Sequence, residues 1–409
     1  MTPPHLTAQL PLRNTARTTA RFTALTPPRF TALTGLRAIA AMMIFGFHLR
    51  KFWVSHLPAF LVRLLNEFQS GVSIFFVLSG FLIAYTYRDR PLDSKKEYIK
   101  YILVRFARIF PIYLLLLTAK YAASGFPSVK ETFLNYTLLK GFSDEYNLTG
   151  IPQSWSLTVE ITFYLLAPLI YLLGQRKKWM PLPVGIGLFL LASLLGFWGY
   201  KTGHNKAYWL YDYLFVLNAT FFGRFFEFYI GMLLAFRLSA STSSPSPASP
   251  APAFGHQPQA LSHRQWLRSP AFRHTLIGFC GILLSMFLVN CFASNGYSPG
   301  TTHLGGVLMR NLLLPIFTAI FIYGLIRETT WLQKILSSRV FVLLGNSSYI
   351  FYLIHINFGY YTLARVKEFP DYNFTLLWLF SIVAYLLLER PLYELVKKRI
   401  RSPRPVSIS

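Results

Sequence analysis

The sequence has few acidic residues, few cysteines and little charge overall. Its 409 residues include 15 Asp and Glu against 40 Lys and Arg, and only 13% are charged, whereas soluble domains carry about 25%. Hydrophobic residues make up 53% of the chain, so the composition excludes an ordinary soluble domain and predicts a membrane protein. Cys280 and Cys291 share one apolar run and are too far apart along a helix to form a disulfide.

Motifs of several activity classes are also missing. There is no nucleotide-binding loop, no GxSxG elbow and no cluster with metal-ligand spacing. We therefore expect no metal and no permanently bound cofactor. The net charge of +25 comes from basic residues between apolar runs, as membrane topology demands. The predicted partner is a lipid bilayer and not a nucleic acid, and no cleavable signal peptide is recognisable.

Ten apolar runs predict an all-α fold, a polytopic membrane helix bundle with about ten transmembrane helices. The runs cover roughly 33–53, 71–87, 101–121, 157–174, 181–200, 210–236, 274–293, 308–326, 341–364 and 374–394. With the N-terminus in the cytoplasm, the predicted inside segments hold 27 Lys and Arg and the outside segments hold 10. This bias predicts a multi-pass protein of the cytoplasmic membrane with both termini inside.

The polar segments divide the chain. Residues 1–32 are a basic arm rich in Arg, Thr and Pro, in which RFTAL occurs twice. The Ser/Pro/Ala-rich stretch 239–270 has too little apolar surface to fold and predicts a flexible cytoplasmic linker. It interrupts a membrane domain that spans 33–395, and residues 396–409 form a basic tail.

The first span, 33–53, contains Arg37 and His48. Ionisable residues within a span are costly and usually functional. Eleven helical steps bring both side chains to one face, with a rise of about 16 Å between them. We interpret His48 as a general base and Arg37 as its charge partner or an anion anchor. The alternative is a histidine that a neighbouring helix satisfies for packing alone.

The third span, 101–121, contains Arg105 and Arg108 near its start, and they share a helix face because they are three residues apart. They stand at its predicted cytoplasmic start, with Pro111 in the first turn. A helix N-terminus with two arginines suits phosphate binding. The same arginines could instead only anchor the span at the membrane surface.

Several other residues have both functional and structural interpretations. Trp155 suits the outer membrane interface, and Glu160 follows it within an apolar run, where a carboxylate must pair or face the interior. Glu389 ends the last span.

Arg224 and Glu227 are three apart and are interpreted as an intrahelical ion pair. A polar stripe in the run 341–364 consists of Tyr349, Tyr352 and His355.

The run from Gly71 to Ile83, GVSIFFVLSGFLI, contains small residues. Gly71, Ser79 and Gly80 allow another helix to approach closely. Taken alone, this pattern is typical of helix packing.

Together these motifs resemble acyltransferase family 3, integral-membrane bacterial O-acyltransferases that modify polysaccharides, lipids and antibiotics. The resemblance covers about 33–395. It rests on TGLRAIAAMMIFGFH, GVSIFFVLSGFLI, the RxxR pair with RIFPIY, SWSLTVEITFYLLAP, GRFFEFYIGMLLA, GNSSYIFYLIH and LERPLYELVKK, in this order. One departure is Thr34, where members often have aspartate. Some members carry an additional extracytoplasmic domain or span, and we see neither here.

The resemblance implies an O-acyltransferase, with O-acetylation as the expected activity. It would use acyl-CoA as co-substrate and a hydroxyl of a cell-envelope carbohydrate or lipid-linked glycan as acceptor. It implies that His48 and Arg37 are essential. We expect Glu160 or Glu389 to orient His48, and Arg105 and Arg108 to bind the CoA phosphates. The residues expected to bind substrate are Ser79, Trp155, Tyr349 and His355.

Two other functions fit the same residues. A transporter or flippase with an Arg–His–Glu proton relay would also need buried ionisable groups. However, the division into six spans and four shows no inverted repeat of broken helices. A scaffold subunit of a cell-envelope assembly is the third possibility. Acyl transfer from acyl-CoA separates the first function from the other two.

Overall fold

The computed structural model describes residues 30–53, 57–87, 94–202, 209–210, 212–240, 272–294, 299–356 and 370–401. The expected arm up to residue 29, the linker at 241–270 and the tail beyond residue 401 lie outside these ranges. The described ranges are mostly helical and contain no β-sheet, which confirms the all-α fold class. The helix in the last range continues to Arg401, so the expected tail begins in helical conformation.

Nine helices in the described ranges are long and apolar enough to cross a membrane, so the chain is a multi-pass helix bundle. They are α2 (Thr31–Trp53), α3 with α4 (Ala59–Asn66 and Gly71–Tyr87), α5 (Lys95–Ser124), α7 (Trp155–Arg176), α8 (Pro181–Lys201), α9 with α10 (Tyr213–Ala219 and Phe221–Ala240), α12 (Arg273–Asn290), α13 with α14 (Leu304–Leu308 and Leu314–Arg327), and α18 with α19 (Pro370–Ala384 and Arg390–Arg401). The remaining predicted run forms α16 (Arg339–Ile354), a shorter apolar helix. Two short helices, α6 (Val129–Tyr136) and α15 (Trp331–Leu336), lie in connections.

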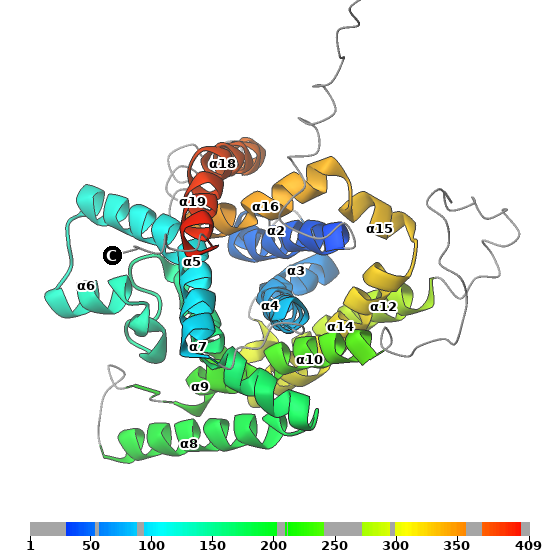
Figure 1. The fold of residues 1–409 in the computed structure, drawn as a ribbon, viewed down its shortest axis with the longest axis horizontal. Helices are drawn as coiled ribbons and strands as arrows, with labels where there is room; N and C mark the ends of the chain where they lie inside the picture. Colours follow the sequence, from blue (N-terminus) through cyan, green and yellow to red (C-terminus); the bar gives the residue numbers. More distant parts are fainter. Residues whose placement is uncertain are drawn as a thin grey trace, which may run out of the picture.

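The helix α2 occupies the middle of the bundle (Figure 1). It packs against α16 and α4, and it also contacts α15 and α14. Its buried side chains include Ala38, Ala40 and Ala41, whose small size lets neighbouring helices approach. The sequence therefore correctly identified the helix around which the others are arranged.

The helices α4 and α10 meet at backbone contact distance. A Cβ atom built on Gly80 would lie 2.1 Å from the carbonyl oxygen of Phe228, and one built on Gly231 would lie 2.1 Å from that of Val77. Gly71 is similarly close to α2, since its Cβ would lie 2.5 Å from the carbonyl oxygen of Ala40. The interpretation of these small residues as helix contacts is confirmed.

The start of α5 differs from the prediction. The helix begins at Lys95, and the Ser94 hydroxyl accepts a hydrogen bond from the backbone N–H of Glu97 at 3.2 Å. Arg105, Arg108 and Pro111 therefore lie well inside the helix, and their predicted position at its N-terminus is wrong. The predicted span begins only at residue 101, although Ser94 and Glu97 fit the Ser-x-x-Glu pattern of a helix start.

The connection from α5 to α7, residues 125–154, contains a buried lysine. Lys140 is fully buried, and its ammonium donates hydrogen bonds to the carbonyl oxygens of Thr149 and Ile151. Burial, together with the nearby Lys120, holds the pKa of Lys140 well below its usual value. Lys140 therefore joins the short helical turn at Leu139–Phe142 to Thr149 and Ile151 within the connection.

The helices α12 and α14 pack against each other and are joined at one end by Glu328, the residue that follows α14. Its carboxylate accepts hydrogen bonds from the backbone N–H groups of His274 at 2.8 Å and Thr275 at 2.9 Å, and from the Thr275 hydroxyl at 2.6 Å. These are free N–H groups of the first turn of α12. Glu328 therefore acts as a helix cap supplied by the neighbouring helix.

Candidate functional site

Three cavities follow α2, and each is lined by residues that the sequence singled out. The arginine cavity is lined by residues that include Arg37, Ser79, Arg105, Arg108, Glu160 and Tyr349. The Glu389 cavity is lined by residues that include Arg37, Arg108 and Glu389. The His48 cavity is lined by residues that include His48, Gln153 and Trp155.

Neighbouring cavities have lining residues in common. Arg37 and Arg108 line both the arginine cavity and the Glu389 cavity. Val72 and Tyr352 line both the arginine cavity and the His48 cavity. The three cavities thus form a row along α2, with the arginine cavity in the middle.

The arginine cavity brings together three arginines from two helices. Arg37 comes from α2, and Arg105 and Arg108 come from α5. The Arg105 guanidinium carbon lies 5.5 Å from the ring centroid of Tyr164 and 5.7 Å from those of Tyr87 and Tyr101, within cation–π range. In the described part of the chain, none of the three arginines has a carboxylate within 4.0 Å. The cavity therefore offers unpaired positive charge to an anionic ligand.

Glu160 lies on the wall of the arginine cavity. Its Oε1 accepts hydrogen bonds from the Ser79 hydroxyl at 2.9 Å and from the Tyr164 hydroxyl. The structure therefore joins Ser79 of α4 to Glu160 of α7, two residues that the sequence predicted for the site. Tyr349 of α16 lines the same cavity, and its hydroxyl donates to the Ile109 carbonyl oxygen at 2.7 Å.

Glu389 lies in the outermost cavity of the row, at the end of a π-helical turn (η7, Tyr385–Glu389). Its side chain is buried, and its Oε2 has no hydrogen-bond partner among the described residues. It shares its cavity with Arg37 and Arg108. Single π-helical turns within α-helices occur frequently at functional sites.

His48 faces the cavity at the other end of the row, together with Trp155 at the start of α7. Its ring lies beside that of His355, with 5.2 Å between the centroids. His355 is buried, and its Nδ1 is 2.7 Å from the Tyr352 carbonyl oxygen. Because a carbonyl can only accept, Nδ1 carries the hydrogen. The Nε2 of His355 then has a free lone pair, and no described residue donates to it.

The glutamates that were expected to orient His48 lie elsewhere in the row. Glu160 faces the arginine cavity and Glu389 faces the cavity beyond it. No hydrogen bond joins either one to His48 among the described residues. The neighbour that the structure does bring to His48 is His355, which the sequence had assigned to substrate binding.

Sequence reasoning missed several residues that shape the site. The Gln153 amide donates to the carbonyl oxygens of Tyr352 at 2.9 Å and Leu353 at 2.6 Å, and so fixes the end of α16 beside α7. Tyr164 was also missed, although it lies four residues after Glu160 and therefore on the same helix face. Gln153 gave no such signal, because its contacts depend on the packing of distant helices.

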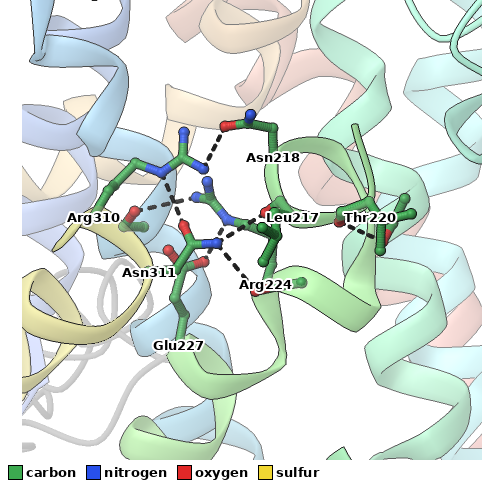
Figure 2. A network of polar contacts seen from close by, with 10 residues as sticks. Leu217, Asn218, Thr220, Arg224, Glu227, Arg310 and Asn311 are labelled. Carbon is green, nitrogen blue, oxygen red and sulfur yellow. Dashed lines mark hydrogen bonds and ion pairs between the residues drawn. The ribbon is translucent and has the colours of Figure 1, made fainter. Parts of the chain in front are cut away.

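The expected ion pair between Arg224 and Glu227 is confirmed. The Arg224 Nε donates to Glu227 Oε2 at 2.8 Å, and both side chains are almost completely buried. Figure 2 shows that this pair belongs to a larger network with Arg310 and Asn311.

The known proteins that this chain is similar to have names that describe acyltransferases. A family model described as an acyltransferase domain matches residues 30–389. A Staphylococcus aureus protein, provisionally named an O-acetyltransferase, is 23% identical over 388 residues, which cover 87% of this chain and 56% of that protein. An acyltransferase of Streptomyces mycarofaciens is 30% identical over 160 residues, which cover 35% of this chain and 39% of that protein.

A protein of Acidianus two-tailed virus, provisionally named an acetyltransferase, is 27% identical over 181 residues, or 43% of this chain and 50% of that protein. The chain thus spans little more than half the length of the first relatives it matches. No solved structure matches the chain.

Proposed function

The chain belongs to acyltransferase family 3, and we propose that it is a membrane O-acyltransferase. The reaction we propose moves an acetyl group from acetyl-CoA to a hydroxyl of a cell-envelope carbohydrate or lipid-linked glycan. The observation that carries the proposal is the row of cavities, with unpaired arginines at its middle and a histidine at one end.

The arginine cavity and the Glu389 cavity are the proposed donor site. CoA carries several phosphate charges, and arginine is suited to phosphate because its guanidinium forms charge-assisted, often bidentate hydrogen bonds. Arg37, Arg105 and Arg108 have no carboxylate within 4.0 Å in the described ranges, so their charge is available. The thioester would then extend past Val72 and Tyr352 towards His48, because these two residues border both cavities.

The proposed chemistry takes place in the His48 cavity. His48 accepts the proton of the acceptor hydroxyl while the hydroxyl oxygen attacks the carbonyl carbon of the thioester. The carbon–sulfur bond then breaks, His48 gives the proton from the acceptor hydroxyl to the CoA thiolate, and the products are an ester and free CoA with its thiol. The Trp155 side chain lines this cavity, and His355 lies beside His48 at its border. In the alternative course, the His48 imidazole itself attacks the thioester and carries the acyl group to the acceptor hydroxyl.

The orientation proposed for the bundle follows from its basic residues. The 27-to-10 distribution of Lys and Arg supports cytoplasmic termini in the cell membrane. Arg37 lies near the start of α2 and His48 near its end. The donor cavity would then open towards the cytoplasm, where CoA is made, and the His48 cavity towards the outside, where envelope glycans are found.

The test is acyl transfer by the purified protein in lipid nanodiscs. Acetyl-CoA labelled in the acetyl group is supplied with a mixture of envelope glycans, and both the labelled ester and the free CoA thiol are measured. We expect His48→Gln to lower turnover by about 10² to 10⁴ because glutamine cannot accept the proton, while acetyl-CoA still binds. A His48→Gln protein with normal turnover would remove His48 from the mechanism. Wild-type protein that binds acetyl-CoA without releasing thiol with any glycan would favour a transporter.

A further inference from the structure

The His48 cavity is lined by two arginines that the proposed transfer does not require. They are Arg224 near the start of α10 and Arg310 in the π-helical turn η6 (Met309–Leu313), which precedes α14. Only 1% of Arg224 and 4% of Arg310 is exposed. Among the described residues that line this cavity there is no aspartate or glutamate.

Hydrogen bonds to three neutral side chains and one carboxylate hold the two arginines in place. Arg224 donates through Nε to Glu227 and through Nη2 to the Ser73 hydroxyl at 3.1 Å. Arg310 donates through Nε to Asn311 Oδ1 at 3.0 Å and through Nη2 to Asn218 Oδ1 at 2.8 Å. In Figure 2 the third nitrogen of each guanidinium carries no dashed line. Each arginine thus keeps one NH₂ group without a partner in the described ranges.

The network fixes Arg310 next to α10. The Asn311 amide donates to the carbonyl oxygens of Leu217 at 2.9 Å and Gly223 at 3.1 Å. Gly223 immediately precedes Arg224 in the sequence, so the π-helical turn is attached where α10 begins. Arg310 and Asn311 both lie within this π-helical turn, and their side chains take part in the hydrogen bonds drawn in Figure 2.

The nearby carboxylates do not neutralise Arg310 directly. Glu227 pairs with Arg224, and no described carboxylate lies within 4.0 Å of Arg310. Glu67 is also buried in this region, but its Oε1 accepts the Gly300 backbone N–H at 2.8 Å and the Asn290 amide at 3.3 Å. Neither acid lines the cavity. Burying a guanidinium without a paired charge is costly, and an acceptor with only hydroxyl groups would not offset that cost.

We propose that Arg224 and Arg310 form an anion subsite in the His48 cavity, and that the acceptor carries a phosphate or carboxylate close to the hydroxyl that is acylated. The inference rests on the proposed function, because it takes the His48 cavity to be the acceptor site. The two unpartnered NH₂ groups would bind the anion, and the acceptor would be oriented with its hydroxyl towards His48. A neutral sugar would lack this contact and bind more weakly.

The experiment measures binding without acyl-CoA, so that its result does not depend on acyl transfer. Wild-type protein in nanodiscs is titrated with three small probes: methyl glucoside, glucuronate and glucose 1-phosphate. We expect at least one anionic probe to bind about tenfold to a hundredfold more tightly than the neutral one. Preference for the phosphate indicates a lipid-carrier or sugar phosphate, and preference for the carboxylate indicates an acidic sugar. Equal binding of all three probes would overturn the inference.

Variants then locate the anion. Arg310→Gln should remove the preference for the anionic probe, while Arg310→Lys, which keeps the charge, should retain part of it. The wild-type comparison remains decisive if Arg310→Gln does not fold. Loss of the preference in Arg108→Gln but not in Arg310→Gln would assign the anion to the arginine cavity and refute the proposal. Charge-selective binding without acyl transfer would retain the subsite and reject the transferase function, so the two failures are distinguishable.

Discussion

Gly80→Ala should destabilise the bundle far more than an ordinary change from glycine to alanine in a helix. The added Cβ would meet the carbonyl oxygen of Phe228 at 2.1 Å, its carbonyl carbon at 2.8 Å and its Cα at 2.9 Å. All three atoms belong to the backbone, so no side chain can rotate away. Ordinary contact begins at 3.4 Å, and α4 and α10 would have to separate by more than 1 Å.

The expected cost is about 3 kcal/mol, at the upper end of the range for overpacked cores, because two whole helices must move. The matched control is Gly187→Ala on α8, where a Cβ would meet nothing within 4 Å. There, the better helix propensity of alanine should stabilise the protein by about 0.5–1 kcal/mol. The midpoint of thermal unfolding in detergent, followed by tryptophan fluorescence, compares the two variants.

The same change should also affect the candidate site. Ser79 precedes Gly80, and its hydroxyl donates to Glu160 at 2.9 Å. Separation of α4 from α10 would shift this bond at the wall of the arginine cavity. If the unfolding free energies of the two alanine variants differ by no more than about 0.5 kcal/mol, a typical effect of a surface substitution, α4 and α10 do not approach at backbone contact distance.

Three further predictions concern the donor path and the connection before α7. Arg108→Gln should weaken acetyl-CoA binding about tenfold, with exposed Lys96→Gln on the same helix as control; equal affinities would exclude a phosphate contact. Val72→Trp should lower transfer much more than it lowers acetyl-CoA affinity, because Val72 borders both cavities while the phosphate-binding arginines are unchanged; normal transfer would mean that the thioester takes another route. The lowered pKa of Lys140 means that the unfolded state binds more protons between that pKa and 10.5, so stability should rise with pH in this window. Lys140→Met should flatten the pH dependence of the unfolding midpoint, and an unchanged slope would contradict the buried charge.

The sequence was sufficient to predict the elements whose signal is local. Apolar runs gave the helices, and the spacing of Arg37 and His48 identified α2 as the helix that faces the cavities. The intrahelical pair of Arg224 and Glu227 was also predictable, because a three-residue separation determines which side chains meet. The start of α5 was mispredicted because only the apolar run from residue 101 was counted, although Ser94 supplied a capping signal.

The remaining features depend on contacts between distant parts of the chain. His355 lies beside His48 only because α16 packs on α2. The division of the predicted site into three cavities, with Glu160 and Glu389 away from His48, follows from the angles at which helices cross. No local pattern encodes those angles. Arg310 was visible as a charge within a span, but its partners Asn218 and Asn311 could not be inferred from spacing.

The cap that Glu328 provides for α12 has a consequence for the order of assembly during synthesis. The first turn of α12 leaves the ribosome with exposed N–H groups that need acceptors. Their acceptor, Glu328, follows directly after α14 and so emerges as soon as the second helix of the pair is complete. The pair of α12 and α14 therefore supplies its own cap for the first turn of α12. It can form as a complete helical hairpin before it packs on the helices that were synthesised earlier.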